Sequence, residues 1–225
     1  MKTIGILGGL GPESTAAYYE TITRAYHELR GDYSYPPIIV YSLSFQPYID
    51  AGYDLPAETL DAIERLAVAG ADFVVAACNS VHLVYDEIAP EVSVPWVSIM
   101  DATAEEILEA GMRKVGLLGT RFTMTKGFFG RALTERGIET ITPEAEGDIE
   151  TVNRIIYDEL VLNVVEDGSR EAVLEVAGRL ARRGAEGIVL GCTELPFLVR
   201  QSDTDTPVFD TTAIHCHKAL SIAVG

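Results

Sequence analysis

The sequence predicts an α/β protein made of two pseudo-symmetric three-layer domains with parallel sheets, with the active site in the cleft between them. Internal repetition indicates the duplication, because three pairs of similar segments recur in the same order at nearly constant spacing. Strand and helix patterns also alternate from end to end, which favours right-handed crossovers and parallel strands. The paired segments are residues 4–8 with 115–119, residues 70–79 with 184–193, and residues 94–97 with 206–209.

Apolar runs bounded by turn residues predict strands, and apolar residues three and four apart predict helices. Before residue 111, strands are expected at 3–8, 37–43, 73–77 and 95–99, and helices at 13–29, 57–69, 81–88 and 102–110. The scheme begins again at 114–119, and the last helix, 212–223, is expected to pack back on the first half. We therefore expect one domain of residues 1–100 plus 211–225 and a second of residues 101–210.

Composition limits the classes of function. The 225 residues are 48% hydrophobic, as in a globular protein, and no apolar run reaches the roughly 18 residues of a membrane helix. The net charge of −17 argues against nucleic acid and anionic membranes as partners. Three cysteines without a CxxC pair fit reduced thiols, and the absence of a cleavage motif predicts a mature cytoplasmic N-terminus.

Two cysteines stand at equivalent places in the two halves. Cys78 and Cys192 each follow an apolar run that predicts a strand, so each is expected at the carboxyl end of a strand. In α/β proteins, ligands bind at this end of the strands. A free cysteine is usually buried and inert, and Cys216, in the middle of the last helix, is interpreted as packing. The matched positions of Cys78 and Cys192 favour function, since a following helix N-terminus lowers a thiol pKa from about 8.5.

A glycine-rich turn, Gly8-Gly9-Leu10-Gly11-Pro12, follows the first strand. Its spacing does not fit a dinucleotide fingerprint, and no lysine follows as in a phosphate-binding P-loop. We interpret the turn as a small-anion site in which the backbone N–H groups of Gly9 and Gly11 face the cleft.

The sequence lacks the residue patterns of a metal site and of a serine hydrolase. His82 lies four residues after Cys78, and two further histidines lie near Cys216, but no compact Cys/His quartet exists, so we expect no metal. His82 is interpreted as a buried structural histidine, with tuning of Cys78 as the alternative. No GxSxG nucleophile motif occurs, and no lysine marks a pyridoxal site, so we expect no cofactor.

Two thiols on opposite sides of a substrate suit inversion at a carbon centre. One thiolate removes the Cα proton, and the other thiol delivers a proton to the opposite face. Such a site must stabilise an enolate-like carboxylate with preorganised donors and exclude water. Asn79, Ser80 and Thr193 follow the cysteines and are candidate donors. Thr120 and Thr123 follow the repeat of the first strand, where an ordinary N-cap is the alternative.

The chain resembles the cofactor-independent aspartate/glutamate racemase superfamily, in its aspartate racemase branch. The residues that carry the resemblance are Gly8 to Thr15, Cys78-Asn79-Ser80-Val81-His82 and Gly191-Cys192-Thr193-Glu194-Leu195. The resemblance covers the whole chain. It implies two pseudo-symmetric domains with a cleft between them, a homodimer that acts in D-amino acid metabolism, an amino acid as substrate, and Cys78 and Cys192 as the acid–base pair.

The chain departs from this family where the side-chain carboxylate of aspartate would bind. Residues 44–50 contain no arginine, and residues 160–163 contain no lysine, although the resemblance implies both. Gln46 is a candidate polar contact there, and Arg121 and Lys126 are the nearest basic residues in sequence. The expected reaction is racemisation of aspartate or another acidic amino acid, and a neutral substrate stays open. The alternative is a catalytically inactive protein of the same fold that binds a small ligand such as an amino acid.

Overall fold

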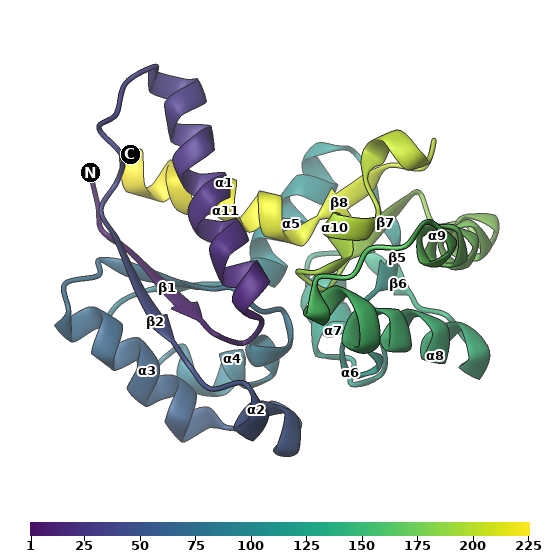
Figure 1. Cartoon of the computed structure of the whole chain (residues 1–225), viewed down its shortest axis with the longest axis horizontal. Helices are drawn as coiled ribbons and strands as arrows, with labels where there is room; N and C mark the ends of the chain where they lie inside the picture. Colours follow the sequence, from purple (N-terminus) through teal and green to yellow (C-terminus); the bar gives the residue numbers. More distant parts are fainter. The chain divides into compact units, whose positions relative to one another are not determined.

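The computed structural model describes residues 1–225, and Figure 1 shows its helices and strands. The chain divides into two compact units. Unit 1 comprises Met1–Ala102 and Thr212–Gly225, and unit 2 comprises Thr103–Thr211. The C-terminal helix thus belongs to the unit built by the start of the chain.

Unit 1 is built on a parallel four-stranded sheet in the order β2-β1-β3-β4. Its central strands are buried, as expected for a parallel sheet covered by helices. The strands are β1 (Ile4–Gly8), β2 (Ile38–Ser42), β3 (Phe73–Ala76) and β4 (Trp96–Val97). The helices are α1 (Pro12–Arg30), α2 (Gln46–Asp50), α3 (Pro56–Val68), the 3₁₀ turn η1 (Ser80–Val84), α4 (Tyr85–Ile88) and α11 (Thr211–Val224), which starts at the unit boundary.

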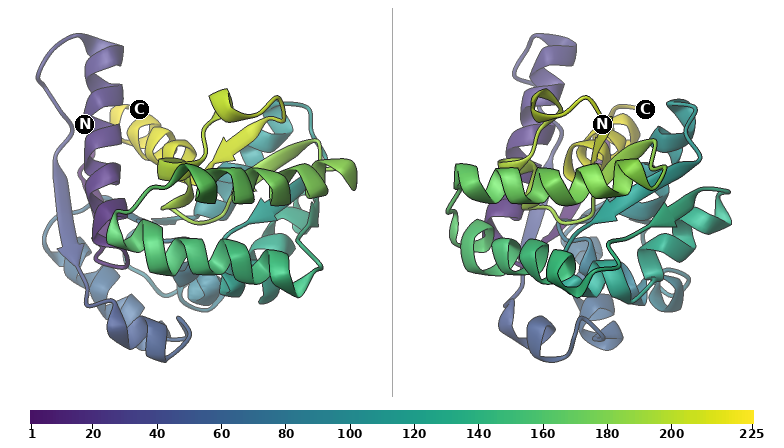
Figure 2. Two further views of the ribbon diagram at one scale, coloured as in Figure 1. Left: turned by 45° about the vertical axis from the view of Figure 1, so that its right-hand side comes forward. Right: turned by 90° about the vertical axis from the view of Figure 1, so that its right-hand side faces the viewer.

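Helices α1 and α11 cover one face of this sheet. Tyr18 and Ile22 of α1 and Cys216 and Ala219 of α11 join one core cluster with residues of β1 and β3. The cluster shows why Cys216 is a packing residue, since its side chain is fully buried. The two chain ends meet here, where the Lys2 N–H donates to the Ala223 carbonyl at 2.9 Å, and both lie close together in Figure 2.

Unit 2 is built on a second parallel sheet in the order β6-β5-β7-β8. Helices α8 and α9 contribute to its main hydrophobic core and run side by side in Figure 2. Its strands are β5 (Lys114–Leu118), β6 (Glu139–Ile141), β7 (Gly187–Leu190) and β8 (Val208–Asp210). Its helical segments are α5 (Ile99–Glu109), which crosses the unit boundary, α6 (Arg121–Thr125), α7 (Phe128–Glu135), α8 (Glu146–Arg154), the π-helix η2 (Ile155–Glu159), η3 (Leu160–Leu162), α9 (Asp167–Arg182), α10 (Leu195–Leu198) and η4 (Gln201–Asp203).

The two sheets repeat each other in strand register. Leu7 of β1 pairs with Ala76 of β3, and Leu118 of β5 pairs with Leu190 of β7. One residue further on, the Ala77 N–H donates to the Leu7 carbonyl and the Gly191 N–H donates to the Leu118 carbonyl, at 2.9 and 2.6 Å. The predicted α/β fold with two parallel sheets is confirmed, and so is the internal duplication on which it rested.

Some local structure differs from the expectation. The continuous helix expected at 81–88 is a 3₁₀ turn followed by the four residues of α4, and the strand expected at 95–99 shortens to Trp96–Val97. Residues after Val97 instead begin α5, three residues before the predicted start at 102. The short helix α2 was not predicted. None of the helices is both long and apolar enough to cross a membrane.

Candidate active site

Cys78 lies at the carboxyl end of sheet strand β3, one residue beyond the Ala77 hydrogen bond to β1. Its side chain is 6% exposed, and the next two residues, Asn79 and Ser80, are equally buried. The helix that follows is a five-residue 3₁₀ turn. A single turn has few aligned peptide dipoles, so the electrostatic field of this helix at the Cys78 sulfur is small. Local hydrogen bonds determine the environment of the thiol instead.

His82 holds the backbone of Cys78. Its Nδ1 lies 3.0 Å from the Cys78 carbonyl oxygen, and the Ile99 N–H points to its Nε2 at 3.3 Å. The ring is 1% exposed, and burial lowers the pKa of His82 to about 4. His82 is therefore a neutral imidazole at pH 7, and it binds the main chain rather than the thiol.

The glycine-rich turn packs tightly against the end of β2. Gly9 has a φ of 83°, and a Cβ there would lie 2.2 Å from the Leu43 carbonyl oxygen. The Gly9 N–H donates to Thr15 Oγ1 at 2.9 Å, and that hydroxyl in turn donates to the Gly11 carbonyl at 3.0 Å. The Gly9 N–H therefore has an internal partner, contrary to the expectation that it is free for an anion. Gly11, with a φ of 120°, requires the conformational freedom of glycine.

The residues that follow β2 carry no cation. Gln46 is exposed on α2, and its amide Nε2 donates to Asp50 Oδ1 at 2.8 Å. Tyr48 is buried on the same helix, its hydroxyl lies 3.1 Å from Thr59 Oγ1, and burial raises its pKa. Cys78 also contributes to this rise, which indicates that α2 lies within electrostatic range of Cys78.

Cys192 occupies the matching place in unit 2, and its thiol has a defined partner. The Cys192 Sγ donates to Glu194 Oε2 at 2.9 Å, and the Thr193 hydroxyl donates to the same oxygen at 3.1 Å. Glu194 is 5% exposed and Cys192 is 7% exposed. A Cβ on Gly191 would lie 2.6 Å from Leu117 Cδ1 and 3.1 Å from the Leu118 carbonyl oxygen, so a larger residue directly before this cysteine requires its neighbours to shift. The buried carboxylate is an acceptor for the thiol proton.

Thr120 and Thr123 form the N-cap of α6. The Thr123 N–H donates to Thr120 Oγ1 at 3.2 Å, and the two hydroxyl oxygens lie 3.1 Å apart. Both side chains are buried. Each hydroxyl thus has a structural role in unit 2, as in an ordinary N-cap.

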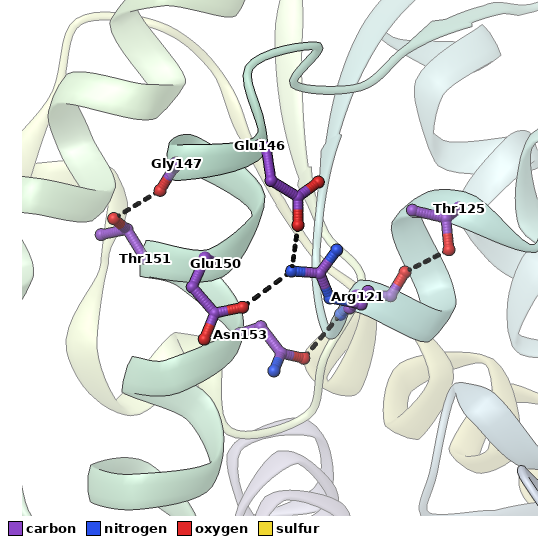
Figure 3. A network of polar contacts seen from close by, with 7 residues as sticks. All are labelled: Arg121, Thr125, Glu146, Gly147, Glu150, Thr151 and Asn153. Carbon is purple, nitrogen blue, oxygen red and sulfur yellow. Dashed lines mark hydrogen bonds and ion pairs between the residues drawn. The ribbon is translucent and has the colours of Figure 1, made fainter.

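Arg121, next to this cap, is engaged with α8 (Figure 3). One guanidinium nitrogen of Arg121 lies 2.7 Å from a carboxylate oxygen of Glu146 and 2.7 Å from one of Glu150. The backbone N–H of Arg121 donates to Asn153 Oδ1 at 2.8 Å. Lys126 lies over the Phe122 ring, with Nζ 5.8 Å from the ring centroid. The guanidinium of Arg121 therefore has two carboxylate partners and is not available to a substrate carboxylate in this arrangement.

Two features of the site escaped the sequence analysis. Glu194 was named only as part of the motif Gly191 to Leu195, although an acid two residues after the cysteine was the available signal. The contact between the His82 and His215 rings, whose centroids lie 6.1 Å apart, could not be found, because no spacing rule links residues so far apart in the chain. No group of three or more His, Cys, Asp and Glu side chains is arranged to hold a metal ion.

Comparison with known proteins identifies the family. Residues 7–219 match the model of the family described as Asp/Glu/Hydantoin racemase. The broad specificity amino-acid racemase RacX of Bacillus subtilis is 27% identical over 224 residues, covering 97% of this chain and 96% of the relative. A solved aspartate racemase homologue from Pyrococcus horikoshii is 40% identical over the full length of both chains, with a TM-score of 0.89. A putative Asp/Glu racemase from Yersinia pestis is 41% identical over the same extent, with a TM-score of 0.90.

A more distant likeness concerns the fold alone. The aspartate racemase of Picrophilus torridus is 22% identical, with a TM-score of 0.80, and covers all of this chain and 95% of its own. The family match spans both units and includes Cys78 and Cys192. This chain therefore belongs to the Asp/Glu/Hydantoin racemase family and is an isomerase of the amino-acid racemase class.

Proposed function

We propose that this enzyme racemises amino acids without a cofactor, with Cys78 and Cys192 as the two acid–base groups. One observation carries the proposal. Each cysteine stands at the same place in one of two duplicated sheets, two residues beyond the matched pairs Leu7–Ala76 and Leu118–Leu190. Duplicated packing alone gives no reason for a thiol at both positions, whereas inversion of a carbon centre needs one proton-transfer group for each face.

The reaction balances with the two thiols alone. The Cys78 thiolate takes the Cα proton of one enantiomer, and the Cys192 thiol gives its proton to the opposite face of the planar intermediate. After this turnover Cys78 is the thiol and Cys192 the thiolate, which is the state that converts the other enantiomer. The Cα–H of an amino acid is a weak acid, so donors must stabilise the carboxylate as it becomes enolate-like.

Glu194 makes the two thiols unequal. Its carboxylate accepts the Cys192 proton at 2.9 Å, and a negative group beside a sulfur disfavours the thiolate. We therefore assign Cys192 as the proton donor of the resting enzyme and Cys78 as the resting base. When the reaction runs in the other direction, Glu194 is the group positioned to accept the Cys192 proton.

The donors proposed for the substrate carboxylate follow the strand ends of both units. They are the backbone of Gly11 and the polar groups of Asn79, Ser80 and Thr193, which adjoin the cysteines. The role proposed for Gly9 requires its hydrogen bond to Thr15 to open, because a backbone N–H has a single proton. The hydrogen bond between the Thr120 and Thr123 hydroxyls uses only one of their two protons, and Gln46 donates one of its two amide protons to Asp50, so these contacts do not have to open for the roles proposed here.

The substrate is proposed to be aspartate together with other amino acids, without strong discrimination. Arg121 is engaged by Glu146 and Glu150, and no arginine or lysine follows β2, so a second carboxylate gains no evident charge partner. The missing charge-assisted hydrogen bond corresponds to about 1.5–3 kcal/mol, or one to two decades of selectivity. The broad specificity stated for the Bacillus subtilis relative points the same way.

The experiment is a panel of single amino acids, including aspartate, glutamate, asparagine, serine and alanine, incubated in D₂O with the purified chain. Deuterium at Cα and the appearance of the opposite enantiomer are both measured. Racemisation of at least one member that is lost in Cys78→Ser supports the proposal. A chain that binds an amino acid but exchanges no Cα proton is instead a ligand-binding protein. The homodimer implied by the family and the cytoplasmic location expected from the sequence remain predictions, the former tested by light scattering.

A further inference from the structure

We infer that His82 is a positioning residue for Cys78: it fixes the carbonyl of the catalytic cysteine and thereby the direction of the thiol, while taking no part in proton transfer. The inference rests on the proposed role of Cys78. It concerns one turn of unit 1, in which the chain leaves β3 and enters η1.

The two hydrogen bonds of His82 determine its tautomer. The Cys78 carbonyl oxygen can only accept, so the Nδ1 that lies 3.0 Å away must carry the proton. The Ile99 backbone N–H can only donate, so the Nε2 that lies 3.3 Å away must be bare. Both ring nitrogens are thus occupied by main-chain groups. A ring in this state has no free nitrogen with which to deprotonate a thiol or a substrate.

The bonds link two neighbouring strand ends. Cys78 follows β3, Ile99 begins α5 directly after β4, and these strands are paired in register through Val74 and Trp96. His82 therefore holds the turn that carries the thiol against the turn that follows the next strand. Strand β4 is only two residues long and its pairing with β3 ends at Val97, so His82 extends the link between the two strands beyond their ladder.

A second buried histidine supports the first. His215 of α11 lies with its ring centroid 6.1 Å from that of His82, and its Nε2 lies 3.0 Å from the Val97 carbonyl oxygen. Because the neutral ring gives its one proton to the Val97 carbonyl, its Nδ1 accepts from the Tyr18 hydroxyl, 2.8 Å away, and that hydroxyl oxygen also lies 3.2 Å from the Ala76 carbonyl oxygen. Two carbonyls around the thiol-bearing turn, those of Cys78 and Val97, are therefore held by histidine N–H groups.

Aromatic neighbours fix the plane of the His82 ring. The centroid of Trp96 lies 5.0 Å away and that of Tyr85 lies 6.0 Å away, the latter in a stacked arrangement. The Tyr85 hydroxyl donates to the Trp96 carbonyl at 3.1 Å. A ring confined in this way has one accessible orientation, so loss of its Nδ1–H cannot be compensated by rotation.

The test uses two substitutions that separate the two hydrogen bonds. His82→Asn places an amide N–H where Nδ1–H stands and keeps the Cys78 anchor. His82→Gln places an oxygen near the position of Nε2 and lacks the Nδ1 donor. Both side chains are polar and of similar size, so each is a control for the other. The rate of alkylation of each cysteine by iodoacetamide is measured by peptide mapping, together with kcat and KM.

In His82→Gln, alkylation of Cys78 is expected to rise about tenfold, the equilibrium factor that corresponds to one lost buried hydrogen bond. Alkylation of Cys192 and of the core residue Cys216 is expected to stay at the wild-type rate. The value of kcat should fall about tenfold or more with KM within twofold, whereas His82→Asn should keep both Cys78 alkylation and kcat within about threefold of wild type.

Two results would overturn the inference. Unchanged Cys78 alkylation and unchanged kcat in His82→Gln would show that the anchor is dispensable. Parallel acceleration at Cys216, which lies in the same unit, would show that His82 only stabilises unit 1 as a whole. The alkylation readout needs no turnover, so a wild-type chain without racemase activity would refute the proposed function while the anchoring of Cys78 is still measured.

Discussion

Acidification from pH 7 to pH 5 should destabilise this protein through its two buried histidines. Burial lowers the pKa of His82 to about 4, and burial together with the nearby His82 lowers the pKa of His215 to about 3. Both are neutral when folded, while in the unfolded chain each titrates with a pKa of about 6.5. The unfolded state therefore binds more protons between pH 6.5 and pH 4, and stability falls as the pH falls through that range.

The magnitude follows from these values. At pH 5 nearly all unfolded histidine is protonated and little of the folded histidine is, so each residue costs about 2 kcal/mol of unfolding free energy relative to pH 7. The two together cost about 4 kcal/mol, against a typical total stability of roughly 5–15 kcal/mol. The loss depends mainly on the unfolded pKa, because both folded values lie well below pH 5.

The assay is urea unfolding followed by circular dichroism at fixed protein concentration, at intervals between pH 7 and pH 5. This window ends above the range in which carboxylates with lowered pKa, such as Glu64 and Glu186, begin to protonate. Wild type and a His217→Gln control, altered at an exposed position of the same helix, should lose about 4 kcal/mol. The double variant His82→Asn/His215→Gln should lose less than about 1 kcal/mol. An equal loss in the double variant, or a flat profile in wild type, would refute the reasoning.

Further outcomes follow from the site. Cys78→Ser and Cys192→Ser should each lower kcat for racemisation by about a thousandfold or more, within the range of a lost general acid or base, while Cys216→Ser should stay within twofold of wild type. Glu194→Gln should lower kcat by roughly ten- to a hundredfold, because the amide cannot take the Cys192 proton; an unchanged kcat would leave the carboxylate without a catalytic role. Arg121→Ala should change kcat/KM for aspartate and for alanine by less than twofold, since its guanidinium is paired with α8; a selective loss with aspartate would place Arg121 in the pocket. Measured kcat/KM values over the panel should differ by less than about a thousandfold between aspartate and the best neutral amino acid, and a larger preference for aspartate would contradict the proposal that the second carboxylate has no charge partner.

The duplicated fold could be predicted because repetition and hydrophobic periodicity are local features of the sequence. Apolar runs such as Phe73–Ala76 and Gly187–Leu190 are bounded by glycine and polar residues, and their matched spacing already indicates two similar sheets. The ends of helices and strands were less predictable where tertiary contacts determine them. Residues 95–99 are apolar except for Ser98 and could all belong to a strand, but pairing with β3 uses only Trp96 and Val97, and the chain then turns into α5.

Only the places of the site residues along the strands and turns could be predicted from the sequence. Strand ends place Cys78 and Cys192, whereas the partners of each thiol depend on side-chain orientation. Glu194 turns back toward Cys192, and His82 turns toward a carbonyl instead of a sulfur. Arg121 was one of the two nearest cations in sequence, but two acids of α8, about 25 residues further on, hold it in unit 2. The orientations of these side chains depend on tertiary contacts, which the periodicity of the sequence does not reveal.

The most direct test of the two-thiol mechanism is the position of deuterium during the first few per cent of racemisation in D₂O. One pure enantiomer of a substrate is supplied, and both enantiomers are analysed for Cα deuterium by chiral separation and mass spectrometry. If Cys78 and Cys192 act on opposite faces of the substrate, as proposed, the newly formed enantiomer should carry solvent deuterium while the remaining substrate keeps its protium. Deuterium entering substrate and product at equal rates, or protium transferred intact into the product, would mean that a single base serves both faces and would contradict the account.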